Sequence, residues 1–502
     1  MPMLKLRPLA IDTHREAVAY INRACTLYRA EEFLALEKIE IVNDGKRLVA
    51  VLNIVDDPAL LAPDELGLSH EAARAFGLPA GSPVRIEHPS RPESLEAVRG
   101  KIQGRILNPE DYAAIIGDIV GRRYSKMEIA AFLVACAGFI TPEEILGLTK
   151  AMAETGRRLQ WRRNGAEEIV VDKHCIGGIP GNRTSMIVVP IAVAHGLTIP
   201  KTSSRAITSP AGTADTMEVL ARVDIGVDEM RDIVDRIGGC LIWGGRANLS
   251  PADDILITVE RPLGIDTRGQ MVASILSKKL TAGSTHLVID MPIGPSAKLR
   301  DRADAVELRK LFEFVGHALG LRLDFIFSDG SQPVGRGIGP VLEARDVLSV
   351  LRNDPDAPAD LRERALLVAG HLLDFDPALP GGKGLARARE LLQSGAALQA
   401  MERIIQAQGP ASEILSPGAL AHEVVAPCDG HVRSIDNLRL ARIARMAGAP
   451  AFKGAGVDLF KKAGDSVRRG EPLFRIHAAL DSDLRFAADL AERDCGYVCG
   501  NS

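Results

Sequence analysis

Two consecutive strand–loop–helix patterns between residues 168 and 218 constrain the fold of this chain more than any other stretch. The first consists of a strand-like run at 168–172, the glycine-rich loop 173–185 and an apolar helix. The second repeats this order further along the chain, around the loop 202–215. Short strands that alternate with helices predict a parallel or mixed sheet covered by helices on both faces, with ligands bound beyond the carboxyl ends of the strands.

The residue types in these two loops favour the binding of an anion. Glycines let backbone N–H groups approach an anion closely, and helix N-termini direct further donors and the positive end of a dipole toward it. Lys173 supplies a point charge, Arg205 a bidentate fork, and several hydroxyl groups add donors. One such loop is more often a plain connection, but two in tandem predict a site for phosphate held without a metal ion.

Length, charge and cysteine usage restrict the architecture and the partners. A chain of 502 residues exceeds what one core usually accommodates, so it should be multidomain. The net charge of −4 predicts no generic affinity for nucleic acid and makes a small molecule the expected partner. The seven cysteines are scattered, and we find no signal peptide or long apolar span, which favours the reducing cytoplasm and no membrane contact. The spacing of histidines and cysteines predicts no metal site.

The pattern along the chain predicts a multidomain α/β protein. Short apolar runs separated by turns such as Asn43-Asp44-Gly45 open the chain, and capping boxes at Ser125 and Thr141 then begin apolar helices. The β-like runs near the end resemble half-motifs of a lipoyl-like barrel, but they lack a lysine signature for a carrier function. The predicted domains are a small N-terminal β-barrel-like domain (1–88), a helical domain (93–165), a large mixed α/β phosphate-binding domain (166–250 and 285–415) and a C-terminal α+β domain (420–502).

Three motifs of the chain are similar to motifs of the thymidine phosphorylase family of nucleoside phosphorylases. They are Lys173-His174 with Gly177-Gly178, the run 203–218 with its Gly212-Thr213, and the segment 274–279 with the sequence SILSKK. The first two resemble the phosphate-binding signatures of the family, and the third resembles its contacts to the base. The length of the chain and the segments 178–184 and 290–298 look most like the AMP phosphorylase branch.

This resemblance covers nearly the whole chain, and it carries expectations about architecture. It implies that residues 251–284 return to the helical domain, so that the active site would be a cleft between two mobile bodies. It implies a homodimer or a higher homo-oligomer, and an N-terminal domain that supports assembly. It also implies that inorganic phosphate is the co-substrate and that no other cofactor is needed.

The resemblance implies a role for each candidate site residue. Asp266 occupies the proton-donor position of the AMP phosphorylase branch, and Lys173 and His174 complete the implied catalytic set. Lys298 would bind a second phosphate, the 5′-phosphate of a nucleotide. The implied phosphate-binding residues are Lys173, Cys175, Gly177, Gly178, Ser185, Ser203 and Thr213. The implied nucleotide-binding residues are Gly178, Ser204, Arg205, Ala206, Ile207, Thr208, Ser209, Thr213, Ser274, Lys278 and Lys298.

One position departs from the family pattern. Cys175 stands where the family generally has serine, and a thiol is a weaker hydrogen-bond donor than a hydroxyl group. Within the positive field of Lys173, we expect the pKa of this thiol to fall and its reactivity to rise. Lys278 and Lys279 are adjacent on a predicted helix, so we do not expect both to face one pocket.

The leading hypothesis is phosphorolysis of a nucleoside 5′-monophosphate to a free base and ribose 1,5-bisphosphate. A thymidine or pyrimidine nucleoside phosphorylase is the close alternative, although the segment 259–262 does not match the base-binding arginine of the pyrimidine enzymes cleanly. A phosphoribosyltransferase is a third possibility, in which Asp253-Asp254 would bind magnesium. A metabolite sensor without turnover gains its only support from Cys175. Neither the base nor the choice between ribose and deoxyribose follows from the sequence.

Overall fold

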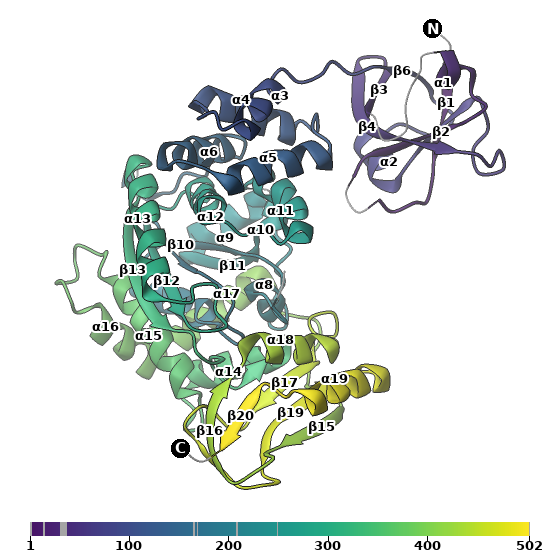
Figure 1. The fold of residues 1–502 in the computed structure, drawn as a ribbon. Helices are drawn as coiled ribbons and strands as arrows, with labels where there is room; N and C mark the ends of the chain where they lie inside the picture. Colours follow the sequence, from purple (N-terminus) through teal and green to yellow (C-terminus); the bar gives the residue numbers. More distant parts are fainter. Residues whose placement is uncertain are drawn as a thin grey trace. The chain divides into compact units, whose positions relative to one another are not determined.

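The computed structural model describes residues 3–13, 16–30, 38–163, 166–167, 169–206, 209–247 and 249–500 (Figure 1). The chain divides into two compact units. The first comprises Met1–Ala151 together with Ile255–Asp266, and the second comprises Met152–Asp254 together with Thr267–Ser502. The finer domain boundaries, including the return of residues 251–284 to the helical domain, stay predictions.

The chain begins with a closed barrel of six strands. Its strand order is β1-β5-β2-β4-β3-β6, and β6 pairs with β1 to complete the circle. The predicted hairpin at Asn43-Asp44-Gly45 is confirmed, because β3 and β4 pair on either side of this turn. The elements are β1 (Leu4–Pro8), β2 (Val18–Asn22), α1 (Thr26–Ala30), β3 (Lys38–Asn43), β4 (Lys46–Val55), β5 (Glu65–Leu68), α2 (His70–Phe76) and β6 (Pro83–Glu87).

Four helices follow the barrel: α3 (Leu95–Ile102), α4 (Pro109–Val120), α5 (Lys126–Gly138) and α6 (Pro142–Glu154). The predicted capping boxes are both present, at Ser125 with Glu128 and at Thr141 with Glu144. Glu144 also accepts a hydrogen bond of 2.6 Å from Lys101, and both side chains are fully buried. This ion pair ties α3 to α6 in the interior of the first unit.

A parallel sheet forms the centre of the second unit, as the sequence predicts. Strands β13-β12-β9 pair in parallel, β10 pairs with β11 in parallel, and a bridge between Val170 and Thr198 joins the two groups. The strand order therefore reverses at β9 and β12, where α/β sheets commonly bind ligands. The strands are β9 (Val171–Cys175), β10 (Ile199–Ser203), β11 (Gly239–Trp243), β12 (His286–Ile293) and β13 (Arg322–Asp329).

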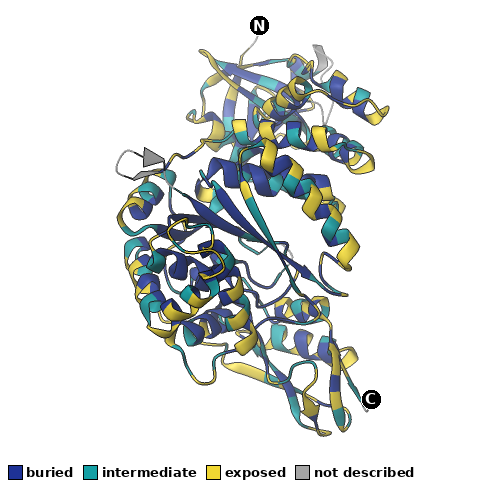
Figure 2. Cartoon of the chain, turned by 90° about the vertical axis from the view of Figure 1, so that its left-hand side faces the viewer, coloured by how far each residue is buried: buried dark blue, intermediate teal, exposed yellow. Residues whose placement is uncertain are grey.

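Helices cover this sheet on both faces. Every residue of α7 from Ser185 to Val193 is buried, and the helix packs in one core with α15, α16 and α17. On the other face Phe312 of α13 lies 6.4 Å from Phe325 of β13, measured between ring centroids. Strands β10, β11 and β12 are largely buried, whereas β13 is mostly only partly buried (Figure 2). The interior of the sheet is therefore closed to solvent along β10, β11 and β12.

The remaining elements of this region are helices and short strands. They are β7 (Arg162–Arg163), β8 (Ala166–Glu167), α7 (Ser185–His195), α8 (Thr213–Met217), α9 (Val227–Ile237), α10 (Gly244–Ala247), α11 (Pro251–Leu263), α12 (Arg268–Thr281), α13 (Arg302–Ala318), β14 (Gly337–Ile338), α14 (Pro340–Arg352), α15 (Ala359–Leu373), α16 (Gly384–Gln393) and α17 (Ala396–Gln408). Among the described residues, no helix is both long enough and apolar enough to cross a membrane.

The chain ends in two small sheets and two helices that share one core (Figure 1). The sheet orders are β14-β17-β19-β15 and β18-β16-β20. The elements are β15 (Leu420–Val425), β16 (Gly430–Ile435), α18 (Asn437–Met446), β17 (Gly456–Leu459), β18 (Ser466–Val467), β19 (Pro472–Ala478), α19 (Asp481–Arg493) and β20 (Tyr497–Gly500). This is an α+β domain, as predicted, and its likeness to a lipoyl-like barrel stays a prediction.

The buried pair of Lys101 and Glu144 gives a test of the first unit. Lys101→Met leaves the Glu144 carboxylate buried without its cation, so we expect a loss of about 3–5 kcal/mol of stability. The measurement is the unfolding transition in urea, and Lys150→Met on the exposed side of α6 is the matched control. An unchanged transition in Lys101→Met would show that the pair does not hold these helices together.

Candidate active site

The first glycine loop connects the carboxyl end of β9 to the N-terminus of α7, as the sequence predicts. Gly181 has a φ of +73°, and a Cβ atom at this position would overlap the carbonyl oxygen of Val334. A side chain therefore does not fit here without moving the backbone after β13. At the other end of the helix, Gly196 caps α7 in the left-handed conformation with a φ of 103°.

Lys173 points from β9 toward the start of α7. Its ammonium group donates a hydrogen bond of 2.7 Å to Oγ1 of Thr184, which in turn contacts the side chain of Asn182 at 3.1 Å. Burial lowers the pKa of Lys173 to about 8, although the neighbouring Asp290 acts in the opposite direction. A buried ammonium group at a helix N-terminus is a suitable anion-binding group. Its hydroxyl partner is Thr184. Ser185, which was predicted to bind phosphate, is the next residue and is buried.

Cys175 is the position at which the expected chemistry is wrong. Its sulfur accepts a hydrogen bond of 3.2 Å from Nδ2 of Asn182, and it is the register neighbour of Asp290 on β12. Burial raises the pKa of the Cys175 thiol far above its usual range, and Asp290 adds to this effect. Lys173 lowers the pKa, as predicted, but this contribution is smaller. The thiol is therefore neutral, and it is not an activated nucleophile.

The second glycine loop is closed by Asp215. This buried carboxylate accepts hydrogen bonds from the N–H groups of Ala206 (2.6 Å) and Gly212 (2.9 Å). Arg205 forms a bidentate pair with Glu218, at 2.6 and 2.8 Å, and stacks over Trp243 at 5.0 Å. This pairing lowers the pKa of Glu218 to about 2. The guanidinium of Arg205 thus pairs with the carboxylate at the end of α8, and its predicted contact with a nucleotide stays a prediction.

The two glycine loops meet at Arg183, a residue that the sequence analysis did not single out. Its guanidinium donates to the carbonyl oxygen of Ala211 in the second loop, at 2.5 Å, and to that of Asn182 in the first, at 3.0 Å. It also pairs with the buried Glu343 of α14. Glu343 accepts a further hydrogen bond of 3.0 Å from Thr216 in α8. The expectation that both loops build one site agrees with this contact.

Helix α12 carries the residues that were expected to contact the base. Lys278 donates to Oγ of Ser274 at 3.0 Å and to Asp253 of α11 at 2.8 Å. Lys279 donates instead to Asp172 of β9, at 2.6 Å. The two lysines therefore make different contacts, as predicted from their adjacency. Asp253, which the sequence analysis weighed as a magnesium ligand, has Lys278 as its counter-ion.

The alternation of side chains along β9 separates its site residues. Lys173 and Cys175 face α7 and Asp290, whereas Asp172 contacts α12 on the opposite face. His174 lies on the α12 face as well, and burial holds its pKa well below the usual range. Lys279, Lys201 and Lys278 act in the same direction. The imidazole is therefore neutral near pH 7 and able to donate one hydrogen bond and accept another.

Lys298 lies in the loop that follows β12, beside the first glycine loop. The Cβ atom of a residue at position 178 would be 3.4 Å from the Lys298 nitrogen of the main chain and 3.5 Å from its Cγ. The side chain of Lys298 is exposed. The structure thus places the main chain and the Cγ of Lys298 close to Gly178, and the predicted contact of Lys298 with a 5′-phosphate stays a prediction.

Other predicted positions are distributed as follows. Ser203 ends β10 and donates to the carbonyl oxygen of Ile242 at 3.2 Å, and Ser209 donates to that of Ala211 at 2.8 Å. Ser204 is exposed, whereas Gly177 and Thr213, the latter at the start of α8, are partly buried. Asp266 belongs to the segment Ile255–Asp266 of the first unit and is exposed. Ile207 and Thr208 lie outside the described residues.

Sequence reasoning missed several charged residues that surround these loops. Asp172, Lys201 and Asp290 all lie within strands and are buried, and Asp290 receives a hydrogen bond of 2.5 Å from Ser328. A signal was available, because a charged residue inside a short apolar run is unusual in a buried strand. Their partners come from distant parts of the chain, so the pattern alone did not identify the contacts.

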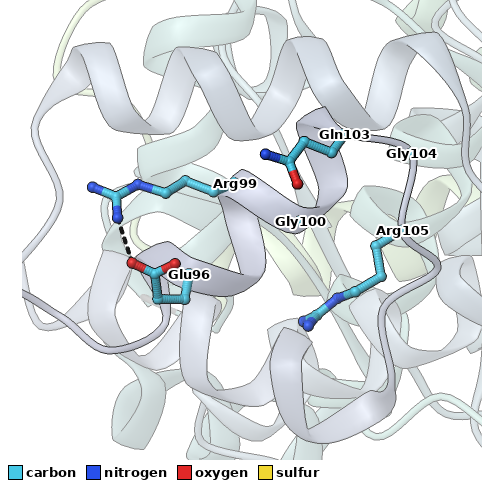
Figure 3. Close-up of a pocket in the computed structure, with 6 residues that line it drawn as sticks. All are labelled: Glu96, Arg99, Gly100, Gln103, Gly104 and Arg105. Atoms are coloured by element: carbon cyan, nitrogen blue, oxygen red, sulfur yellow. Dashed lines mark hydrogen bonds and ion pairs between the residues drawn. The ribbon is translucent and has the colours of Figure 1, made fainter.

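A surface hollow of about 590 Å³ lies elsewhere, beside α3 in the first unit (Figure 3). Its two arginines both have carboxylate partners, since Arg99 pairs with Glu96 and Arg105 with Asp111. None of the predicted site residues lines it. The lining residues are Glu96, Arg99, Gly100, Gln103, Gly104 and Arg105.

Comparison with known protein families divides the chain into three matched segments. Residues 95–156 match the helical bundle domain of a glycosyl transferase family, and residues 167–398 match the a/b domain of a glycosyl transferase family. Residues 431–497 match the C-terminal domain of pyrimidine nucleoside phosphorylases. These matches agree with the predicted order of helical, α/β and C-terminal domains.

The chain is also similar to whole proteins. It is 60% identical to a "Putative thymidine phosphorylase" from Rhodopseudomonas palustris (strain BisA53). The matched region of 497 residues covers 99% of this chain and 96% of the relative. It is 57% identical to a protein of the same name from Methylococcus capsulatus (strain Bath), again over 99% of this chain and 96% of the relative. Anthranilate phosphoribosyltransferase from Thermus thermophilus shares the fold, with a TM-score of 0.52 at 22% identity, over 62% of this chain and 99% of that one.

The raised pKa of Cys175 predicts slow alkylation. At pH 8, iodoacetamide should modify Cys175 at least tenfold more slowly than an unperturbed thiol, because each unit of pKa above the pH lowers the thiolate fraction about tenfold. Peptide mass spectrometry over time measures the rate, with the partly exposed Cys428 as internal control. Fast labelling of Cys175 that is blocked by phosphate would contradict the raised pKa and would show that the thiol is activated.

Proposed function

We propose that this chain, which belongs to the thymidine phosphorylase family, catalyses the phosphate-dependent cleavage of the N-glycosidic bond of a nucleoside or nucleotide. Inorganic phosphate is the co-substrate in this proposal, and no other cofactor is required. The observation that carries it is the junction of the two glycine loops at Arg183, beside the ammonium group of Lys173. This arrangement supports a site for a tetrahedral anion at the carboxyl end of a parallel sheet.

The reaction needs three things from the protein. Phosphate must be held beneath the anomeric carbon, the positive charge that develops on the sugar must be tolerated, and the departing base must receive a proton. In the proposal Lys173, with the first glycine loop and the hydroxyl groups of Ser203 and Thr213, holds phosphate. The neutral His174 orients the base or sugar by a hydrogen bond, and Asp266 donates the proton. No covalent nucleophile is involved, which is consistent with the neutral thiol of Cys175.

For the substrate we propose a nucleoside 5′-monophosphate, cleaved to a base and ribose 1,5-bisphosphate. The 5′-phosphate of the nucleotide would be the second phosphate in the site, beside the inorganic phosphate. The site therefore needs a second cation near the first. Lys298 beside Gly178 supports this assignment. In the proposal Ser274 and Lys278, which contact each other on α12, face the base.

Thymidine or another pyrimidine nucleoside is the second candidate substrate. The names of the relatives and the pyrimidine nucleoside phosphorylase C-terminal domain favour it. In that case the products are the base and a pentose 1-phosphate, and Lys298 does not select the substrate. A phosphoribosyltransferase would differ from both in needing magnesium.

A substrate panel with one variant decides between these candidates. We expect phosphate-dependent base release, without magnesium, from AMP, CMP or UMP and not from thymidine or uridine. In Lys298→Ala, kcat/KM for the nucleotide should fall roughly tenfold to hundredfold, because a charge-assisted hydrogen bond contributes about 1.5–3 kcal/mol. Lys310→Ala, at an exposed position of α13, is the matched control. Turnover of thymidine that is unchanged in Lys298→Ala would establish the nucleoside phosphorylase instead.

The proton donor is tested separately with Asp266→Asn. We expect kcat to fall about a hundredfold to ten-thousandfold, the usual contribution of general acid catalysis, while the binding of phosphate is unchanged. Single-turnover base release and phosphate-dependent thermal stabilisation measure the two properties. Asp228→Asn, at an exposed position of α9, is the control. Full activity of Asp266→Asn would remove this residue from the mechanism.

A further inference from the structure

A buried triad of charged residues lies next to the candidate site and has no role in the proposed reaction. Asp172 of β9 receives hydrogen bonds or ion pairs from Lys279 of α12, at 2.6 Å, and from Lys201 of β10, at 3.3 Å. The exposed fractions are 0% for Asp172, 5% for Lys201 and 3% for Lys279. Charged side chains are rarely buried to this degree unless they are paired.

The triad is unbalanced in charge, since two amines share one carboxylate. Within the part of the chain that the structure describes, the remaining hydrogen bonds do not supply a second negative group, because Lys201 donates to the carbonyl oxygen of Thr202 at 2.9 Å. The carboxylate also accepts a hydrogen bond of 2.7 Å from the backbone N–H of Lys173. A surplus cation in a buried site is costly, so either one amine gives up its proton or an anion completes the balance.

The triad connects the three elements that carry the candidate site. Strand β9 carries Lys173, β10 continues into the second glycine loop, and α12 carries Lys278. Its charge also reaches the anion-binding amine. The pKa of Lys173 is lowered mainly by burial, and Lys201 contributes to the shift in the same direction.

We propose that Asp172, Lys201 and Lys279 form a charge reserve of the anion site, in which the surplus ammonium group is balanced by phosphate bound at the Lys173 loop. Lys201 is a positioning residue here, because it acts through the field at Lys173 and does not touch the substrate. The proposal deepens the proposed function and rests on its assignment of the Lys173 loop to phosphate.

The charge reserve formed by Asp172, Lys201 and Lys279 makes the affinity for an anion depend on pH. In the ligand-free protein burial and Lys201 lower the pKa of Lys279, so the triad holds its surplus proton weakly near neutral pH. A bound anion favours the charged form and takes up that proton. The other titratable groups on this side are His174 of β9, Cys240 of β11 and Lys278 of α12. Lys173 points to the opposite face of β9, where the charge of Lys201 still acts on its amine. Anion affinity should therefore fall as the pH rises.

Sulfate is the appropriate probe, because it remains a dianion over the whole range in which phosphate itself titrates. Binding to the 502-residue chain is measured by calorimetry and thermal shift between pH 6 and 9, for the wild type, Lys201→Met and the exposed control Lys310→Met. At pH 7 we expect Lys201→Met to weaken sulfate binding at least roughly fivefold, because the loss of a nearby cation weakens the attraction for a dianion. The pH dependence should become shallower, since one titrating proton is removed.

The ligand-free protein distinguishes this role from a structural one. Lys201→Met leaves a neutral Lys279–Asp172 pair, so we expect its melting temperature without sulfate to be equal to or above that of the wild type. A lower melting temperature with an unchanged pH slope would make Lys201 a structural residue and overturn the proposal. Unchanged sulfate affinity would overturn it as well.

A second variant guards against misfolding of the first. Lys279→Met removes the same surplus charge from a different element and should weaken sulfate binding to a similar degree, whereas a local packing defect would affect only one of the two variants. The proposed enzymatic function fails separately, if the wild type binds sulfate but releases no base from any substrate of the panel.

Discussion

The buried ion pair between Arg183 and Glu343 is the contact on which the rest of the site depends. Away from water, each group must find all its partners within the protein, and Arg183 finds them in both glycine loops while Glu343 also accepts from Thr216. Burial raises the pKa of Glu343, and Arg183 opposes this shift. The pair therefore fixes the two loops against α14 only while both partners are present.

The two faces of β9 then divide the chemistry. On one face, Lys173 and Cys175 lie against α7 and the buried Asp290, in surroundings that keep a thiol neutral and an ammonium group available to an anion. On the other face, burial and the neighbouring lysines keep the imidazole of His174 neutral. Adjacent residues of one strand thus reach different electrostatic environments, because a strand directs successive side chains to opposite faces.

The electrostatic state of two side chains depends on surroundings that the sequence does not show. The raised pKa of Cys175 and the pairing of Arg205 with Glu218 both depend on what surrounds the side chain, and sequence shows the charge of a neighbour more readily than its burial. The expectation for Cys175 counted the attraction of Lys173 and omitted the cost of burying a thiolate, which is larger. For Arg205, the sequence analysis considered the guanidinium as a donor to a ligand. It did not consider the carboxylate of Glu218, thirteen residues later, which pairs with this guanidinium in the structure.

The sequence by itself determined the local elements: the strand–glycine loop–helix repeats and the capping boxes at Ser125 and Thr141. These depend on residues close together in the chain, and backbone sterics and periodicity suffice to predict them. Only the tertiary structure decided that Arg183 joins the two loops and that Asp172 shares its charge with Lys201 and Lys279. These contacts link residues far apart in sequence, and their strength depends on burial, which exists only after the chain has folded.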